Sequence, residues 1–165
     1  MSPDEAFIVT ILRALEAVRL EAIIIGNAAA VMQGAPVATR DVDLLVRDTP
    51  SNREKLDELS QVLGVGRPAP IGELTTALRI TGTTWPIDIV FETMSAALSF
   101  ASVRSRSRAV TIADVTATVA SLEDVIRSKE AAGRPKDLAV LPILRDVLRV
   151  RRALEETGEP PSDGD

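Results

Sequence analysis

The sequence contains no cysteine, no histidine and no tyrosine, and these absences exclude several classes of site. Without cysteine the chain has no disulfide bond, no thiol nucleophile and no cysteine-ligated zinc. Without histidine it has no Ser-His triad, no imidazole proton shuttle and no histidine-ligated zinc. Any catalysis must therefore use carboxylates, Lys, Arg, Ser or Thr, or a metal ion held by oxygen ligands.

Aromatic side chains and long apolar segments are also scarce. Aromatic residues make up 2% of the chain, which disfavours binding of single-stranded nucleic acid by base stacking. The longest apolar run, residues 22–32, is interrupted by Gly26 and Asn27 and is too short to cross a membrane. The sequence does not start with a cationic segment followed by an apolar one, which disfavours a secretory signal. We therefore expect a cytoplasmic protein with no membrane partner.

Length and apolar content predict one domain. The chain has 165 residues, of which 45% are hydrophobic, enough for a sizeable core. We assign residues 1–154 to a single domain and residues 155–165 to an acidic disordered tail. The net charge of -5 is unevenly distributed, since residues 1–100 are acidic and residues 101–152 are basic. This division would suit metal ligands in the first part and phosphate contacts in the second, although ordinary charge on helix surfaces explains it equally well.

Apolar spacing and turn residues predict a mixture of helices and strands. Helices are expected at 4–20, 28–33, 51–63, 95–102, 121–132 and 135–154, with Asn27 as the N-cap of the second. Strands are expected at 22–25, 41–46, 77–81, 87–91, 109–112 and 116–119. The strands at 77–81 and 87–91 are candidates for antiparallel neighbours, and the last two for a hairpin. Strand and helix stop alternating after residue 77, which disfavours a doubly wound parallel sheet. The fold class is α/β (α+β), a mixed β-sheet flanked by helices and closed by a C-terminal helical pair.

Two aspartates lie on one of these strands. Asp41 and Asp43 are two residues apart, so their side chains project from the same face of the strand. Two carboxylates on one face beside a buried sheet are costly unless a cation lies between their oxygens. Mg²⁺ prefers such oxygen ligands and shares them with substrate phosphates. The pair therefore points to phosphoryl or nucleotidyl chemistry, while a solvated strand end is the alternative.

A third aspartate interrupts the apolar strand at 87–91. An ionised carboxylate such as Asp88 is rarely buried without a partner or a metal. If this strand lies beside the strand of Asp41 and Asp43, the three carboxylates form one cluster that can hold divalent ions. Asp88 would then also help to deprotonate an acceptor hydroxyl. The alternative is an edge-strand acid that faces water, and Glu92 is a weaker substitute for Asp88.

The dipeptide Gly26-Asn27 lies before a short helix and ahead of the aspartate pair. Glycine lets the backbone approach a ligand closely, and free N–H groups at a helix start attract phosphate. A simple helix cap is the other explanation.

The sequence also contains a basic segment, in which Arg104, Arg106 and Arg108 alternate with serine. On a strand these arginines would share a face that could bind RNA or DNA phosphates, although a charged edge strand that prevents aggregation is the preferred interpretation.

Taken together, these residues resemble the polymerase-beta-type nucleotidyltransferase superfamily. Its motif is Gly-Gly or Gly-Ser, a spacer, Asp-x-Asp, and a third acid on a later strand. Here the corresponding residues are Gly26, Asn27, Gly34, the segment 39–43 and Asp88. Within the superfamily the chain is similar to small bacterial abortive-infection (AbiEii-type) toxins, which carry a downstream Lys…Arg…Asp segment. Residues Lys129, Arg134, Lys136 and Asp137 match that style.

The resemblance implies a role for each of these residues. Asp41, Asp43 and Asp88 would be the catalytic residues and would hold Mg²⁺, with Mn²⁺ as the alternative ion. Asp88 would also assist the hydroxyl nucleophile. The nucleotide would be bound by Gly26, Asn27, Thr39, Lys129 and Arg134. For the two basic residues, a surface helix end is the other explanation.

The implied activity is transfer of a nucleoside monophosphate from an NTP to a hydroxyl acceptor, which is RNA, protein or a small molecule. A toxin–antitoxin system, with a cognate antitoxin or toxin as partner, is the biological setting that the resemblance suggests. One residue departs from the motif, because Asn27 is bulkier than the usual Gly or Ser. That departure leaves a second hypothesis open, a non-catalytic protein that keeps the fold and binds a partner.

Overall fold

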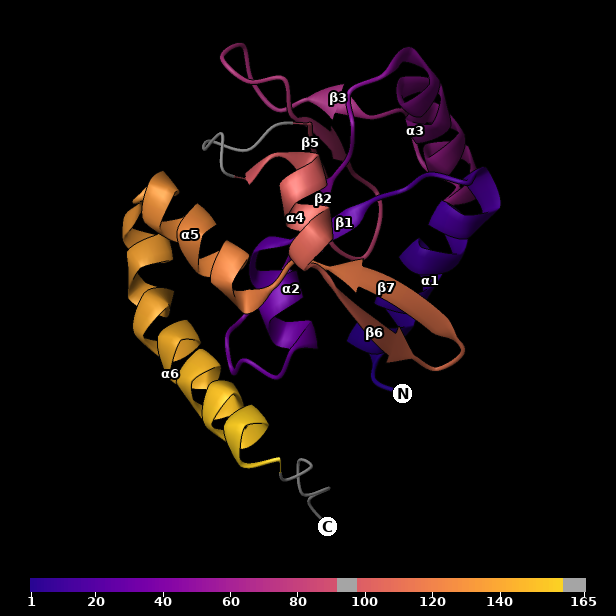
Figure 1. The fold of residues 1–165 in the computed structure, drawn as a ribbon. Coiled ribbons are helices and arrows are strands. Elements are labelled where there is room, and N and C mark those ends of the chain that lie inside the picture. The colour runs from indigo at the N-terminus through magenta and orange to yellow at the C-terminus, as the bar shows by residue number, and fades with distance from the viewer. Residues whose placement is uncertain (92–97, 159–165) are drawn as a thin grey trace.

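The computed structural model describes residues 1–91 and 98–158. Within these ranges, strands and helices form a central mixed sheet with helices on both sides (Figure 1). The strands are β1 (Ile23–Ile25), β2 (Val42–Leu45), β3 (Ala69–Pro70), β4 (Leu78–Ile80), β5 (Ile87–Val90), β6 (Arg108–Ile112) and β7 (Val115–Val119). The helices are α1 (Pro3–Val18), α2 (Gly26–Met32), α3 (Pro50–Val62), α4 (Phe100–Arg106), α5 (Leu122–Ala132) and α6 (Pro135–Thr157). The predicted fold class is confirmed.

The sheet has the strand order β3-β4-β5-β2-β1-β7-β6. Strands β2 and β5 are parallel neighbours, as are β1 and β7, and the other pairs are antiparallel. The central strands are apolar and buried, with Ile23, Leu44 and Ile89 inaccessible to solvent. The predicted antiparallel pairing of the strands near 77–81 and 87–91 is confirmed by β4 and β5, and the predicted hairpin by β6 and β7.

The helices on the two sides of the sheet form in agreement with their apolar spacing. Helix α1 starts in a capping box, in which the Ser2 hydroxyl accepts from the Glu5 N–H and the Glu5 carboxylate accepts from the Ser2 N–H. Figure 1 shows α1 and α3 on one side of the sheet and the pair α5–α6 on the other, with α2 between this pair and the sheet. The C-terminal pair is tied to α2 because Arg151 donates to the backbone carbonyl and to Oε1 of Gln33, at 2.6 and 3.0 Å.

Three details differ from the sequence-based expectation. Asn27 is not the N-cap of α2, because Ile25 occupies that position without a side-chain cap and Asn27 lies in the first turn. The two-residue strand β3 lies in a segment that was expected to be a loop. Helix α6 continues through Thr157, so residues 155–157 of the expected tail are helical, while residues 159–165 lie outside the described residues.

The described ranges, 1–91 and 98–158, contain no helix that is both long and apolar enough to cross a membrane.

Candidate active site

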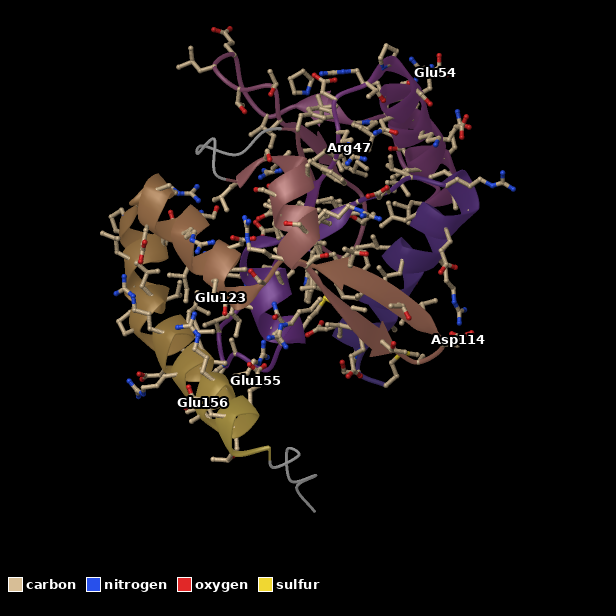
Figure 2. The ribbon with its side chains drawn as sticks, in the orientation of Figure 1. Arg47, Glu54, Asp114, Glu123, Glu155 and Glu156 are labelled. Carbon is tan, nitrogen blue, oxygen red and sulfur yellow. The ribbon has the colours of Figure 1, made fainter. Side chains whose placement is uncertain are left out.

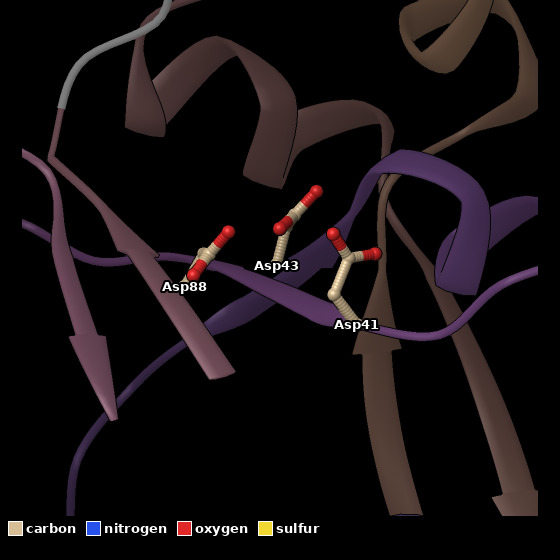
Figure 3. A group of neighbouring side chains, drawn as sticks. All are labelled: Asp41, Asp43 and Asp88. Atoms are coloured by element: carbon tan, nitrogen blue, oxygen red, sulfur yellow. The ribbon is translucent and has the colours of Figure 1, made fainter. Parts of the chain in front are cut away.

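The three aspartates meet on one face of the sheet. Strands β2 and β5 are parallel neighbours, and their register places Asp43 directly beside Asp88. Asp41 lies just before β2, two residues from Asp43, and therefore projects from the same face. One carboxylate oxygen from each of the three lies within 4.8 Å of those of the other two. Figure 3 shows the three side chains converging above the two strands.

Crowding and burial make Asp43 hard to ionise. Burial first of all, and then the negative charges of Asp41 and Asp88, raise the pKa of Asp43 to about 7, although the positive charges of Lys129 and Arg134 act in the opposite direction. A buried carboxylate beside two others is stabilised by a positive charge between them. The donor set consists of carboxylate oxygens from three aspartates. It therefore fits Mg²⁺, and equally Mn²⁺, in preference to a softer metal.

This pKa predicts that divalent ions compete with a proton. Below pH 7 the ion must displace the proton of Asp43, so Mg²⁺ affinity should rise by up to about tenfold per pH unit and level off above the pKa. Calorimetric titration in buffers of different ionisation enthalpy measures both the affinity and the proton released.

The raised pKa of Asp43 has the opposite effect on the stability of the metal-free protein, which should decrease as the pH rises. Between the ordinary pKa of 3.8 and about 7, the folded protein keeps a proton that the unfolded chain has lost. The free energy of unfolding should therefore fall as the pH rises through that range. A Mg²⁺ affinity independent of pH would contradict this assignment.

Gly26 brings the start of α2 against the carboxylates. Its φ of +67° lies in the left-handed region, and a Cβ built there would be 2.6 Å from Oδ2 of Asp43. Only glycine satisfies both conditions without strain. The structure thus gives a steric reason for the glycine that the sequence motif singled out.

Asn27 follows and, together with the three aspartates, lines one cavity. Its Nδ2 donates to the backbone carbonyl of Ala38 at 3.1 Å, which fixes the connection between α2 and β2. Its Oδ1 is buried and accepts no hydrogen bond from any residue in the described ranges. A buried unpaired acceptor is costly, so this oxygen is suited to a donor group on a ligand.

Arg79 is the site residue that sequence reasoning missed. It lies on β4, opposite Asp88 in the antiparallel pair β4–β5. Its Nε and Nη2 donate to the two oxygens of Asp88 at 2.7 and 3.0 Å. This fork holds the third carboxylate in place and supplies a positive charge in the absence of metal. The signal in the sequence was a cation inside an apolar strand, next to an acid inside another.

We expect Arg79→Gln to destabilise the metal-free protein by about 1–3 kcal/mol, because it leaves the largely buried Asp88 without a counter-charge. Saturating Mg²⁺ should remove much of the difference, since the ion supplies a positive charge to the same cluster. Thermal unfolding with EDTA and with Mg²⁺ measures both effects. The matched control is Arg13→Gln, whose ion pair with Asp114 is exposed and should contribute less than about 1 kcal/mol. Equal destabilisation with and without Mg²⁺ would show that Arg79 acts only as a packing residue.

Basic residues from the C-terminal helices face the acids across a cavity of about 290 Å³. Lys129 of α5 and Arg134, which precedes α6, both line it, as do Lys136, Asp137 and the three site aspartates. Arg134 donates to both oxygens of Asp137 at 2.6 and 3.3 Å, and the Lys129 ammonium lies 3.5 Å from the same carboxylate. Burial raises the pKa of Asp137, but the Arg134 hydrogen bond and the charges of Arg134 and Lys129 outweigh it and hold this pKa below its ordinary value. Asp137 is thus an anion that orients two cations at the site.

Other predicted residues lie elsewhere. The Thr39 hydroxyl donates to the backbone carbonyl of Asp41 at 2.9 Å, and its side chain lines a different cavity; its contact with nucleotide stays a prediction. Glu92, the substitute for Asp88, lies outside the described residues.

The strand considered for the alternating arginines is wrong for two of them, while the third lies on the edge strand β6, in agreement with the preferred interpretation. Arg104 and Arg106 belong to α4 and only Arg108 to a strand, because Phe100 and Val103 are buried by helix formation. The three side chains form ion pairs with Glu21, Asp124 and Glu155 respectively. Glu155 is marked in Figure 2, on the last turns of α6.

Comparisons with known proteins show the fold. No protein-family model matches the sequence, and no curated protein matches it. Solved structures do match. The antibiotic-resistance factor ANT(2'')-Ia, in complex with adenylyl-2''-tobramycin, superposes with a TM-score of 0.61 and 18% identity over 96% of this chain and 100% of that one. A protein from Thermotoga maritima assigned as a nucleotidyltransferase gives 0.60 and 16% over 94% and 96%.

A nucleotidyltransferase-like protein from Paracoccidioides brasiliensis gives a TM-score of 0.57 and 20% identity, over 91% of this chain and 78% of that one. These neighbours share the architecture described above, a mixed sheet with flanking and C-terminal helices. The chain therefore has the nucleotidyltransferase fold.

Proposed function

We propose that this protein transfers a nucleoside monophosphate from an NTP to a hydroxyl acceptor and releases pyrophosphate, in a reaction that depends on Mg²⁺ or Mn²⁺. The observation that carries the proposal is the meeting of Asp41, Asp43 and Asp88 opposite Lys129 and Arg134. A nucleotide site combines acidic residues that bind a metal cation with cationic residues that contact phosphate. An NTP donor also fits the predicted cytoplasmic location.

In this proposal each side chain has a distinct task. Asp41, Asp43 and Asp88 hold the metal. When bound, the divalent ion neutralises phosphate charge and lowers the pKa of the attacking hydroxyl. Asp88, held by Arg79, would take the proton of the acceptor hydroxyl, the role that the family resemblance implies for it. The remaining contribution of the protein is to position donor and acceptor and to stabilise developing charge, without a covalent intermediate.

The triphosphate would bind between the start of α2 and the C-terminal helices. Because Gly26 has no Cβ, the start of α2 can lie directly against the Asp43 carboxylate. Among the phosphate contacts that the family resemblance implies, Lys129 has the strongest structural support. Its side chain is only 11% exposed and lines the cavity of the three aspartates. A compact ammonium at that point can pair with one phosphate oxygen.

We expect Lys129→Gln to raise the KM for NTP by about tenfold or more, since it removes a partly buried charge contact to phosphate. The fold should be retained, because Asp137 keeps its pair with Arg134. Initial-rate kinetics over a range of NTP concentrations measures the change. Lys55→Gln, on α3 and away from the cavity, is the control and should leave the KM unaltered. An unchanged KM in Lys129→Gln would remove this residue from the nucleotide site.

The acceptor can be identified by labelling. RNA, protein and small molecules were all left open by the sequence. The structural neighbour ANT(2'')-Ia was solved with an adenylylated small molecule, so hydroxylated small molecules are the class to test first. NTPs labelled on the α-phosphate should mark one fraction of a bacterial extract in the presence of Mg²⁺, and the double variant Asp41→Asn/Asp43→Asn should mark none. Absence of labelling together with absence of NTP and Mg²⁺ binding in calorimetry would refute transferase activity.

A second candidate function is favoured by two observations. Arg79 occupies both oxygens of Asp88, and Asn27 replaces the small motif residue, as expected for a chain that keeps the fold but binds a partner instead. Such a protein could be one half of an AbiEii-type toxin–antitoxin pair. If the chain inhibits growth when expressed and the Asp41→Asn/Asp43→Asn variant inhibits equally, partner binding rather than transfer is its function. Loss of inhibition in that variant would favour a catalytic toxin.

A further inference from the structure

A second and larger cavity lies on the other side of the connection between α2 and β2. Its volume is about 520 Å³, within the range of small-molecule sites. It is bounded by the first turns of α1, by α2, by residues 37–39 and by the edge strand β6. Figure 1 shows the N-terminus beneath the β6–β7 hairpin, where this cavity is located. It shares no lining residue with the cavity of the three aspartates.

The walls of this cavity are mostly apolar. Ile8, Met32, Val37 and Ile112 line it together with the indole of Trp85. The Trp85 ring is held in an edge-to-face contact with Phe7, with centroids 5.6 Å apart and an angle of 78° between the planes. A packed aromatic side chain offers an apolar body a rigid surface at little cost in conformational entropy. The site therefore suits a compact hydrophobic group.

The charged groups of the cavity all have one sign. Asp4 and Glu5 line it, and no Lys or Arg in the described ranges does. Glu5 is fixed there because its Oε2 accepts from the Ser2 N–H at 2.8 Å. Two carboxylates without a lining cation repel anions, including nucleotides, and attract a positively charged head group. Its charge thus distinguishes this cavity from the cavity of the three aspartates, which Lys129 and Arg134 also line.

We propose that this cavity is a ligand site for a compact apolar molecule that carries a single positive charge, such as a hydrophobic amine. The apolar body would lie against Trp85 and Val37, and the ammonium would face Asp4 and Glu5. The proposal is independent of the transfer chemistry, because none of the three site aspartates, Lys129 or Arg134 lines this cavity.

The sequence provides its own reporter for this site. Trp85 is the only tryptophan and the chain has no tyrosine, so its emission reports on the cavity wall. Three probes with one apolar body are suitable: 1-adamantanemethylamine, 1-adamantanemethanol and 1-adamantanecarboxylate. We expect a saturable change in Trp85 emission, with the amine binding about five- to tenfold more tightly than the alcohol at low ionic strength, and the carboxylate binding most weakly. The preference for the amine should shrink in high salt.

Three variants separate charge from shape. Asp4→Asn/Glu5→Gln should bring the affinity of the amine down to that of the alcohol, and glutamine at position 5 preserves the capping box. Val31→Phe should weaken all three probes by filling space, and Val31 is 38% exposed, so the larger side chain has room. The control Glu54→Gln/Glu58→Gln removes the same charge from the exposed side of α3, where Figure 2 marks Glu54, and should change nothing.

Two results would overturn the proposal. One is the absence of a saturable response of Trp85 to the amine, and the other is equal affinity of the wild-type protein for amine and alcohol. If Val31→Phe does not fold, as judged by circular dichroism, the surface variant Asp4→Asn/Glu5→Gln still decides the matter.

Discussion

Replacing Asp43 by asparagine should abolish nucleotidyl transfer and, in the absence of divalent ions, stabilise the fold. Both effects have the same cause. The carboxylate of Asp43 is half-buried between Asp41 and Asp88, and this desolvation and crowding raise its pKa to about 7. Above that pH its charge is costly in the metal-free protein, and asparagine removes the charge while its amide can donate to the neighbouring carboxylates.

The expected magnitudes are large enough to separate function from stability. Loss of one carboxylate of the proposed metal site should lower the rate of transfer by about a thousandfold or more. The gain in the free energy of unfolding at about pH 8 in EDTA should be on the order of 1–3 kcal/mol. Radiolabel transfer measures the first quantity and denaturant unfolding the second. With Mg²⁺ present the order of stability should reverse, because only the wild-type site gains from binding the ion.

A matched control for Asp43→Asn is Asp146→Asn. Asp146 lies on α6 with an exposed side chain and pairs with Arg149, so neither transfer nor the effect of Mg²⁺ should change. An Asp43→Asn protein less stable than wild type in EDTA would contradict the electrostatic account of this site.

Gly26→Ala is the second variant for which we expect a large effect. The substitution places a Cβ only 2.6 Å from Oδ2 of Asp43, too close for van der Waals contact, and forces an L-residue to adopt a φ of +67°. The backbone strain should cost about 1–2 kcal/mol. Displacement of the Asp43 carboxylate should in addition weaken Mg²⁺ binding and transfer by about a hundredfold, as is typical when a reacting group moves by about an ångström.

Gly64→Ala separates the two contributions. Gly64 has a φ of +73°, but a Cβ there would meet nothing within 4 Å. It should therefore show the backbone cost alone, with unchanged Mg²⁺ affinity in calorimetry. If both variants lose stability equally and both bind Mg²⁺ normally, the close approach of Gly26 to Asp43 has no functional role.

The cluster of three aspartates in the candidate site could be predicted because it depends on local sequence patterns. Asp41 and Asp43 alternate on a strand, and Asp88 interrupts an apolar one, so their common face follows from strand geometry once β2 and β5 are neighbours. That adjacency is a property of the whole sheet and could only be assumed. The same limit concealed Arg79, since its register opposite Asp88 depends on how the chain turns between β4 and β5.

Other elements were missed because long-range contacts decide them. Strand β3 exists only through its pairing with β4, and its Ala-Pro sequence carries no strand signal. The alternating arginines near 104–108 suggested a strand by period alone, yet Phe100 and Val103, three residues apart, pack inward and make the segment helical. Asn27 looked like a cap, but its amide is used to fix the loop at Ala38.

The parallel pairing of β2 with β5 has a consequence for folding. Asp43 and Asp88 are far apart in the sequence and become neighbours only when these two strands align in register, since a shift by one residue would turn one carboxylate to the opposite face. A chelating site therefore cannot precede the assembled sheet. Uptake of a divalent ion during refolding should appear late, together with the native fluorescence of Trp85. It would report when β2 and β5 align in register.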